Sequence, residues 1–122
     1  MTMTALMTKT SGLDLMAMRK SAGSATAFLR SMANEDRLLL LCQLTQGEKN
    51  VGDLESLTGI AQPTLSQQLG VLRAEGLVAT RREGKFIYYS LDDARVLAML
   101  ESLHGLFCRG SRKTIKQGGV RA

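Results

Sequence analysis

The chain is poor in the groups that mark membrane, secreted and catalytic proteins. Aromatic residues make up 4% of its 122 residues, so a core must be built from Leu, Val, Ala and Met. The longest apolar run, Leu38 to Cys42, is far too short to span a bilayer. Residues 1–12 lack the apolar segment of a signal peptide. We therefore expect a cytoplasmic protein without a membrane partner, in which thiols are normally kept reduced.

Catalytic and metal-binding side chains are also scarce. The chain has one histidine, His104, and two cysteines, Cys42 and Cys108. It has no recognisable Cys–His nucleophile setting, no phosphate-binding loop and no carboxylate cluster in a cleft-forming pattern. Borderline-soft metals require three or four nitrogen or sulfur ligands, so the supply is thin. We expect a protein that is not an enzyme and has no cofactor or resident metal.

Positive charge is concentrated locally. The net charge is +5, but residues 109–122 hold five cations and no acid, so residues 1–108 balance to zero. Residues 56–91 nevertheless hold four cations against two acids. This clustering, rather than the net charge, favours a nucleic-acid partner.

Apolar spacing and capping residues predict five helices and two strands. Asn34 offers an N-cap, and Asn50 with Asp53 resembles a capping box. Gly76 stands where a left-handed residue would end a helix. The helices are expected over about 14–32, 35–45, between 50 and 59, between 61 and 76, and over 92–108. The strands are expected over about 78–82 and 86–91, joined by a turn at 83–85.

The helix between 61 and 76 and the following hairpin carry the side chains suited to DNA. Its Leu65, Leu69 and Leu72 form one buried stripe, which turns an amide- and hydroxyl-rich face outward. Gln pairs bidentately with adenine, Ser and Thr are more permissive, and cations at a hairpin tip contact phosphates or the minor groove. The residues predicted to contact DNA are Gln62, Thr64, Ser66, Gln67, Gln68, Arg81, Arg82 and Lys85.

Two structural interpretations compete with DNA binding. Any solvated helix has a polar face, although this one lacks the Glu/Lys pairs that usually decorate it. Lys and Arg also commonly protect exposed edge strands from aggregation. A protein-interaction module that kept this fold without binding DNA would have the same order of elements.

Three segments carry a family resemblance: NEDRLLLLC, QPTLSQQLGVLRAEGLV and RREGKFIYYSL. Through them the chain resembles the ArsR/SmtB family of prokaryotic transcriptional repressors over about residues 14–108. The resemblance implies a mainly α winged helix-turn-helix with a β-hairpin wing, forming a homodimer through its first and last helices. It implies binding to an inverted-repeat DNA operator until an inducer arrives. One departure is Gln68, where family members often have His.

Composition at the two ends, together with the extent of the resemblance, divides the chain into three parts. Residues 1–12 are expected to be a disordered tail, 13–108 the DNA-binding and dimerisation domain, and 109–122 a basic disordered tail.

The inducer is less directly indicated. Where family members have a Cys-x-Cys metal site, this chain has Asn50 and Gly52. Where others pair Asp and His along the last helix, it has two acids and only His104. Cys42 and Cys108 resemble instead the dithiol branch that responds to sulfide or redox changes.

That branch implies an intrasubunit disulfide or polysulfide bridge, formed with reactive sulfur species or oxidants, which releases DNA. Two alternatives remain for the thiols. One is a zinc or copper site made of Cys42, His104 and Cys108, and the other is a pair of inert buried thiols.

Overall fold

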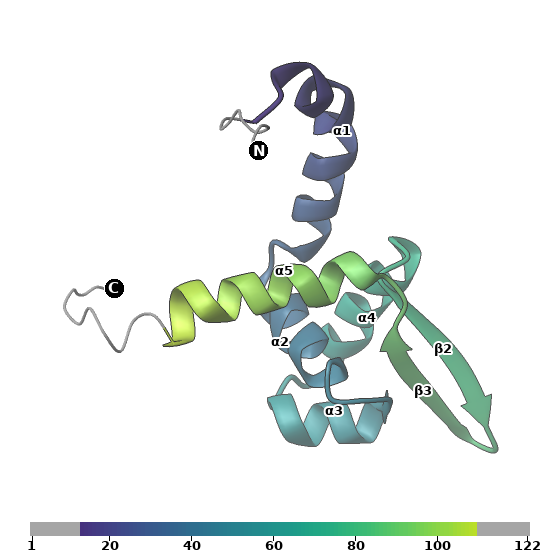
Figure 1. The fold of residues 1–122 in the computed structure, drawn as a ribbon. Helices are drawn as coiled ribbons and strands as arrows, with labels where there is room; N and C mark the ends of the chain where they lie inside the picture. The colour runs from purple at the N-terminus through teal and green to yellow at the C-terminus, as the bar shows by residue number, and fades with distance from the viewer. Residues whose placement is uncertain (1–12, 110–122) are drawn as a thin grey trace. The chain divides into compact units, whose positions relative to one another are not determined.

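The computed structural model describes residues 13–109 (Figure 1). They divide into two compact units, of which the first ends at Ala33 and the second begins at Asn34. These residues form five α-helices and a small antiparallel sheet, as expected of a winged helix-turn-helix. The predicted tails, 1–12 and 109–122, lie outside the described residues except for Arg109. None of the described helices combines the length and the apolar character needed to cross a bilayer.

The first unit is helix α1, Leu15–Met32. Asp14 caps it, because the carboxylate accepts hydrogen bonds from the backbone N–H groups of Met16 and Ala17 at 3.0 and 3.3 Å. The bounds match the prediction within one residue. Apolar side chains remain exposed along the helix, among them Leu29.

The second unit begins with α2, Glu35–Leu44, and α3, Val51–Thr58. The side chain of Asn34 accepts from the N–H of Arg37 at 3.0 Å and so caps α2. The capping box of α3 is confirmed: Asn50 Oδ1 accepts from the N–H of Asp53 at 2.8 Å, and Asp53 Oδ2 from that of Asn50 at 3.5 Å. Both helices therefore begin where their local sequence predicts.

Helix α4, Thr64–Ala74, begins about three residues later than predicted. Pro63 occupies the N-cap position and not the first turn. The reason is that Gln62 and Pro63 form a turn, and the side chain of Gln62 accepts from the N–H of Ser66 at 3.1 Å. That side-chain cap takes the place of a further helical turn.

The end of α4 follows its sequence signal. Gly76 has φ 79°, and the N–H of Leu77 donates to the carbonyl of Leu72 at 2.9 Å. The N–H of Gly76 donates to the carbonyl of Arg73 at 3.0 Å. This pair of bonds is a Schellman motif, as predicted.

The sheet contains one strand more than predicted. Strands β2, Val78–Glu83, and β3, Phe86–Leu91, form a hairpin that projects away from the helices of its unit (Figure 1). A third strand, β1, Lys49–Asn50, pairs with the other edge of β3. A two-residue strand has too little sequence to show a periodicity, so only its pairing reveals it.

Helix α5, Ala94–His104, continues into a π-helical turn η1, Gly105–Arg109. A single helix ending at Cys108 was predicted, so the wide last turn is a correction. Gly105 starts this turn, and glycine is a poor residue for continuing an α-helix. Short π-helical segments are frequent at functional sites.

The core of the second unit is aliphatic, as the composition requires. Its fully buried side chains are Leu40, Leu41, Leu54, Leu65, Leu69, Leu72, Leu77 and Val96. The leucine-rich sequence of α2, with apolar residues almost all round the helix, would suggest burial on every side, and Leu57 belongs to the apolar residues of α3. Leu39 of α2 is nevertheless 49% and Leu57 54% exposed, so α2 is buried on one face only.

Alanine substitutions at two glycines, Gly70 within α4 and Gly76 after its end, should change the free energy of unfolding in opposite directions. A Cβ added at Gly70 or Gly76 would meet no atom within 4 Å, so only the backbone distinguishes them. Gly70→Ala should raise the free energy of unfolding by about 0.5–1 kcal/mol, because Gly is a poor interior helix residue. Gly76→Ala should lower it by about 1–2 kcal/mol, because its φ is left-handed. Urea unfolding measures both, and effects of the same sign would contradict the assignment.

Candidate nucleic-acid interface and dithiol pocket

The predicted polar face of α4 is exposed. Because Leu65, Leu69 and Leu72 are buried in the core, the helix must turn its remaining sides away from it. Ser66 and Gln67 are exposed on the first turns. The structure also leaves Gln62 exposed and Thr64 half-buried near the same N-terminus. These four residues form one hydroxyl- and amide-rich surface, here called the α4 polar face.

Gln68 differs from its neighbours on α4. It is half-buried, and its Oε1 accepts a hydrogen bond of 2.8 Å from Nη1 of Arg37 on α2. Sequence reasoning missed Arg37, because the two residues are 31 positions apart. A local pattern offers no signal for such a contact.

Arg81, predicted to contact DNA, is engaged within the protein. Its Nε and Nη2 bind the carboxylate of Glu48 at 2.7 and 2.8 Å, and its Nη1 binds Glu83 at 2.8 Å. The guanidinium also lies 4.7 Å from the ring centroid of Tyr88. Hydrogen bonds from Arg81 lower the pKa of Glu48, and those to Glu48 and Glu83 raise the pKa of Arg81.

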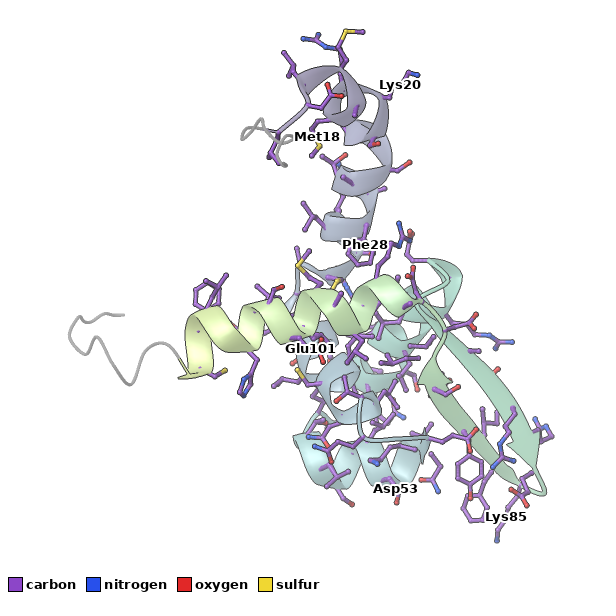
Figure 2. All side chains as sticks on the ribbon, in the orientation of Figure 1. Met18, Lys20, Phe28, Asp53, Lys85 and Glu101 are labelled. Atoms are coloured by element: carbon purple, nitrogen blue, oxygen red, sulfur yellow. The ribbon has the colours of Figure 1, made fainter. Side chains whose placement is uncertain are left out.

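The other two hairpin cations are more accessible. Arg82 and Lys85 are exposed, and the ion pairs of the hairpin within residues 13–109 involve neither of them. Lys85 lies at the tip of the hairpin (Figure 2). Its Nζ is 5.9 Å from the ring centroid of Phe86, a neighbour that does not neutralise the charge. The basic character of the hairpin is therefore carried outward by Arg82 and Lys85.

A second site lies between α2 and the end of α5. A pocket of about 300 Å³ is open there, lined by residues from α2, α5 and η1. Its lining residues are Leu38, Cys42, Leu100, Leu103, His104, Phe107 and Cys108. The two cysteines, 66 positions apart in the sequence, thus share one largely aliphatic pocket, here called the dithiol pocket.

The two thiols are chemically distinct from a buried inert pair. Both are exposed, and neither is part of a disulfide in the described structure. The pKa of Cys42 is raised, first by partial burial of its sulfur and then by negative charge on Cys108. A charge on one thiol is therefore felt by the other. Their exposure, and not the pKa of Cys42, argues against the alternative of two inert buried thiols.

The metal alternative has weaker support. His104 lines the pocket with both cysteines. Yet within residues 13–109 there is no group of three His, Cys, Asp or Glu side chains placed to hold a metal ion. The ligand set made of Cys42, His104 and Cys108 is therefore not assembled in the part of the chain that the structure describes.

Comparison with known proteins agrees with this geometry. Residues 34–80 match the sequence profile of the bacterial regulatory proteins of the arsR family. The chain is 48% identical to the biofilm growth-associated repressor of Agrobacterium fabrum, over 79% of this chain and 82% of that protein. It is 42% identical to the transcriptional activator HlyU of Vibrio cholerae, over 82% of this chain and 93% of that one. The crystal structure of the transcriptional repressor BigR from Xylella fastidiosa matches with TM-score 0.76 at 44% identity, covering 79% of this chain and 98% of that one.

The mutual influence of the thiols can be measured by alkylation. Cys108→Ser removes one of the two causes that raise the pKa of Cys42. The thiolate fraction of Cys42 at pH 8 should therefore rise, and Cys42 should react faster with iodoacetamide than it does in the wild-type protein. Mass spectrometry of the modified peptide follows the rate. An unchanged rate would mean that the two sulfurs do not interact in solution; Ser102→Ala, on an exposed position of α5, is the control.

Proposed function

The chain belongs to the ArsR family of bacterial regulatory proteins, and from this premise we propose that it is a dimeric transcriptional repressor that binds operator DNA. The observation that carries the proposal is the exposed α4 polar face beside a hairpin whose Arg82 and Lys85 are exposed. In helix-turn-helix docking, the N-terminal part of the second helix enters the major groove. The relatives named above are transcriptional regulators and not enzymes, which agrees with this reading.

The proposed DNA contacts are of two kinds, those to base edges and those to phosphates. Gln67, with Ser66 and Thr64, would meet base edges in the major groove, since amides and hydroxyls hydrogen-bond there. Gln62 would join them while also stabilising the start of α4. Arg82 and Lys85 would bind phosphates and set the orientation of the protein without reading sequence.

Arg81 has a different role in this proposal. Its guanidinium is held by Glu48 and Glu83 and lies over Tyr88, so a phosphate would have to displace existing partners. We therefore assign Arg81 to holding the hairpin against the turn that precedes β1.

A dimer would present two copies of the α4 polar face. Support comes from large apolar side chains exposed on α1 and at the end of α5, such as Leu29 and Phe107. Exposed apolar surface of this kind commonly marks a protein interface. Two copies related by a two-fold axis would bind an inverted repeat, with half-sites about 34–36 Å or a multiple apart.

The dithiol pocket would be the sensor. Cys42 and Cys108 would form a disulfide when an oxidant removes two hydrogens from them. They would form a polysulfide when a sulfane-sulfur donor, such as a persulfide, inserts sulfur between them and is itself reduced, its remainder leaving as thiol or hydrogen sulfide with the two thiol hydrogens. The pocket supports this use because it brings both accessible thiols to one apolar space, where weakly hydrated sulfur is tolerated. A bridge would fix the end of α5 and η1 against α2, changing the spacing of the two α4 helices.

The number of phosphate contacts can be measured from how the DNA affinity depends on salt concentration. Arg82→Ala should weaken binding to all sequences and reduce the slope of log K against log salt by about one unit, because one phosphate contact is lost. Arg81→Ala should weaken binding with little change in slope, because it loses hairpin orientation instead. Fluorescence anisotropy between about 50 and 200 mM salt measures both. If Arg81→Ala reduces the slope as much as Arg82→Ala does, Arg81 also contacts a phosphate.

The sensor can be tested by removing either sulfur. Cys42→Ser and Cys108→Ser should bind operator DNA as the wild type does in reductant, and should keep binding when an organic persulfide or peroxide is added. Intact-mass spectrometry of the wild type should show added sulfur after persulfide or the loss of two hydrogens after peroxide. A single-serine variant that still releases DNA would refute the bridge, and zinc-dependent release in the presence of reductant would favour the metal site instead.

A further inference from the structure

We propose that Arg37 and Gln68 form a positioning contact that passes the state of the dithiol pocket to the recognition helix α4. Gln68 then orients α4 and does not read a base, unlike its neighbour Gln67. This inference rests on the proposed function, because it assigns a route between the proposed sensor and the proposed DNA surface.

The contact itself is well defined. Nη1 of Arg37 donates to Oε1 of Gln68 at 2.8 Å, and both side chains are half-buried. A guanidinium can only donate, so the partner must be the carbonyl oxygen of the Gln68 amide. Hydrogen bonds with an ionised donor are shorter and roughly twice as strong as those between neutral groups. This bond therefore constrains where α4 lies against α2.

Helix α2 joins the two sites. Leu38 and Cys42 line the dithiol pocket, while Arg37 reaches α4. Cys42 follows Arg37 by five positions, which is a rise of about 7.5 Å and a rotation of about 140° along one helix. The cap from Asn34 to the N–H of Arg37 fixes the turn that carries the guanidinium. A displacement of α2 at Cys42 therefore moves Arg37 as part of the same rigid element.

Helices α2 and α4 are in contact, and both carry fully buried leucines, among them Leu41 and Leu69. Such close-packed interiors compress little and transmit displacement. A hydrogen bond adds direction to this packing, because it weakens steeply when its angle falls below about 120°. The Arg37–Gln68 bond would therefore respond to a shift of α2 either by pulling α4 or by breaking.

The engagement of Gln68 also explains why it is unsuited to base reading. Bidentate pairing of Gln with adenine uses both the amide oxygen and the amide N–H₂ group. In Gln68 the oxygen is held by Arg37, whereas the adjacent Gln67 is exposed on the α4 polar face. Two neighbouring glutamines therefore have different roles, which gives the test its matched control.

The experiment compares Gln68→Met with Gln67→Met. Methionine keeps the shape of the side chain and removes its hydrogen bonds. The affinity for the operator and for single-base variants is measured with reduced protein and with protein carrying the Cys42–Cys108 bridge. Gln68→Met should weaken reduced-state binding by one common factor on all variants, and the ratio of reduced to bridged affinity should fall about fivefold. Gln67→Met should change preference at one or two positions and leave that ratio unchanged.

A rescue variant separates positioning from reading. Gln68→Glu keeps an acceptor for Arg37 but lacks an amide donor, so it should restore the affinity ratio and leave base preference unchanged. Its added negative charge should lower both affinities by a similar factor. Circular dichroism verifies folding. If Gln68→Met does not fold, the base preference of Gln68→Glu decides in its place.

The outcomes distinguish the two proposals. A changed preference at a particular base pair in either Gln68 variant would overturn the positioning role. An unchanged affinity ratio in Gln68→Met would overturn the coupling. If the wild type binds DNA equally in both states, the proposed sensor fails, while the reduced-state measurements still test whether Gln68 positions or reads.

Discussion

The burial of one leucine face on α4 against α2 is the constraint on which the other features depend. Leu65, Leu69 and Leu72 are removed from water, and each such side chain contributes about 1.5–3 kcal/mol when fully buried. Because the three leucines can be buried in only one rotation of the helix, that rotation also decides that Gln67 faces outward and that Gln68 reaches Arg37. The α4 polar face is thus a consequence of core packing.

Charge on the hairpin is organised by pairing as well as by number. Arg81 is shared between Glu48 and Glu83, and its side chain is still 50% exposed. Exposed ion pairs of this kind contribute little to stability. The bidentate geometry with Glu48 nevertheless orients the hairpin, and it leaves Arg82 and Lys85 to present positive charge outward. A cluster of like cations is therefore divided into one that holds the hairpin and two that face solvent.

The dithiol pocket holds two exposed thiols whose charges affect each other. Both sulfurs are exposed, but burial and the charge of Cys108 raise the pKa of Cys42, so the two thiols do not ionise together easily. The π-helical turn η1 carries Cys108 at the end of α5, where a local change of backbone winding could bring it toward α2.

The sequence by itself determined what rests on bonds between near neighbours. Three such features are the capping box at Asn50, the Schellman motif at Gly76 and the leucine stripe of α4. Each involves residues only a few positions apart, so the local sequence is enough to predict it. Only the tertiary structure decided the pairing of β1 with β3 and the partners of Arg37 and Arg81, which lie 31 and 33 positions away. It also decided that the two cysteines share a pocket. Those contacts exist because the helices and strands pack in one particular arrangement, and no local preference of the chain encodes which distant residue will then come within hydrogen-bonding distance.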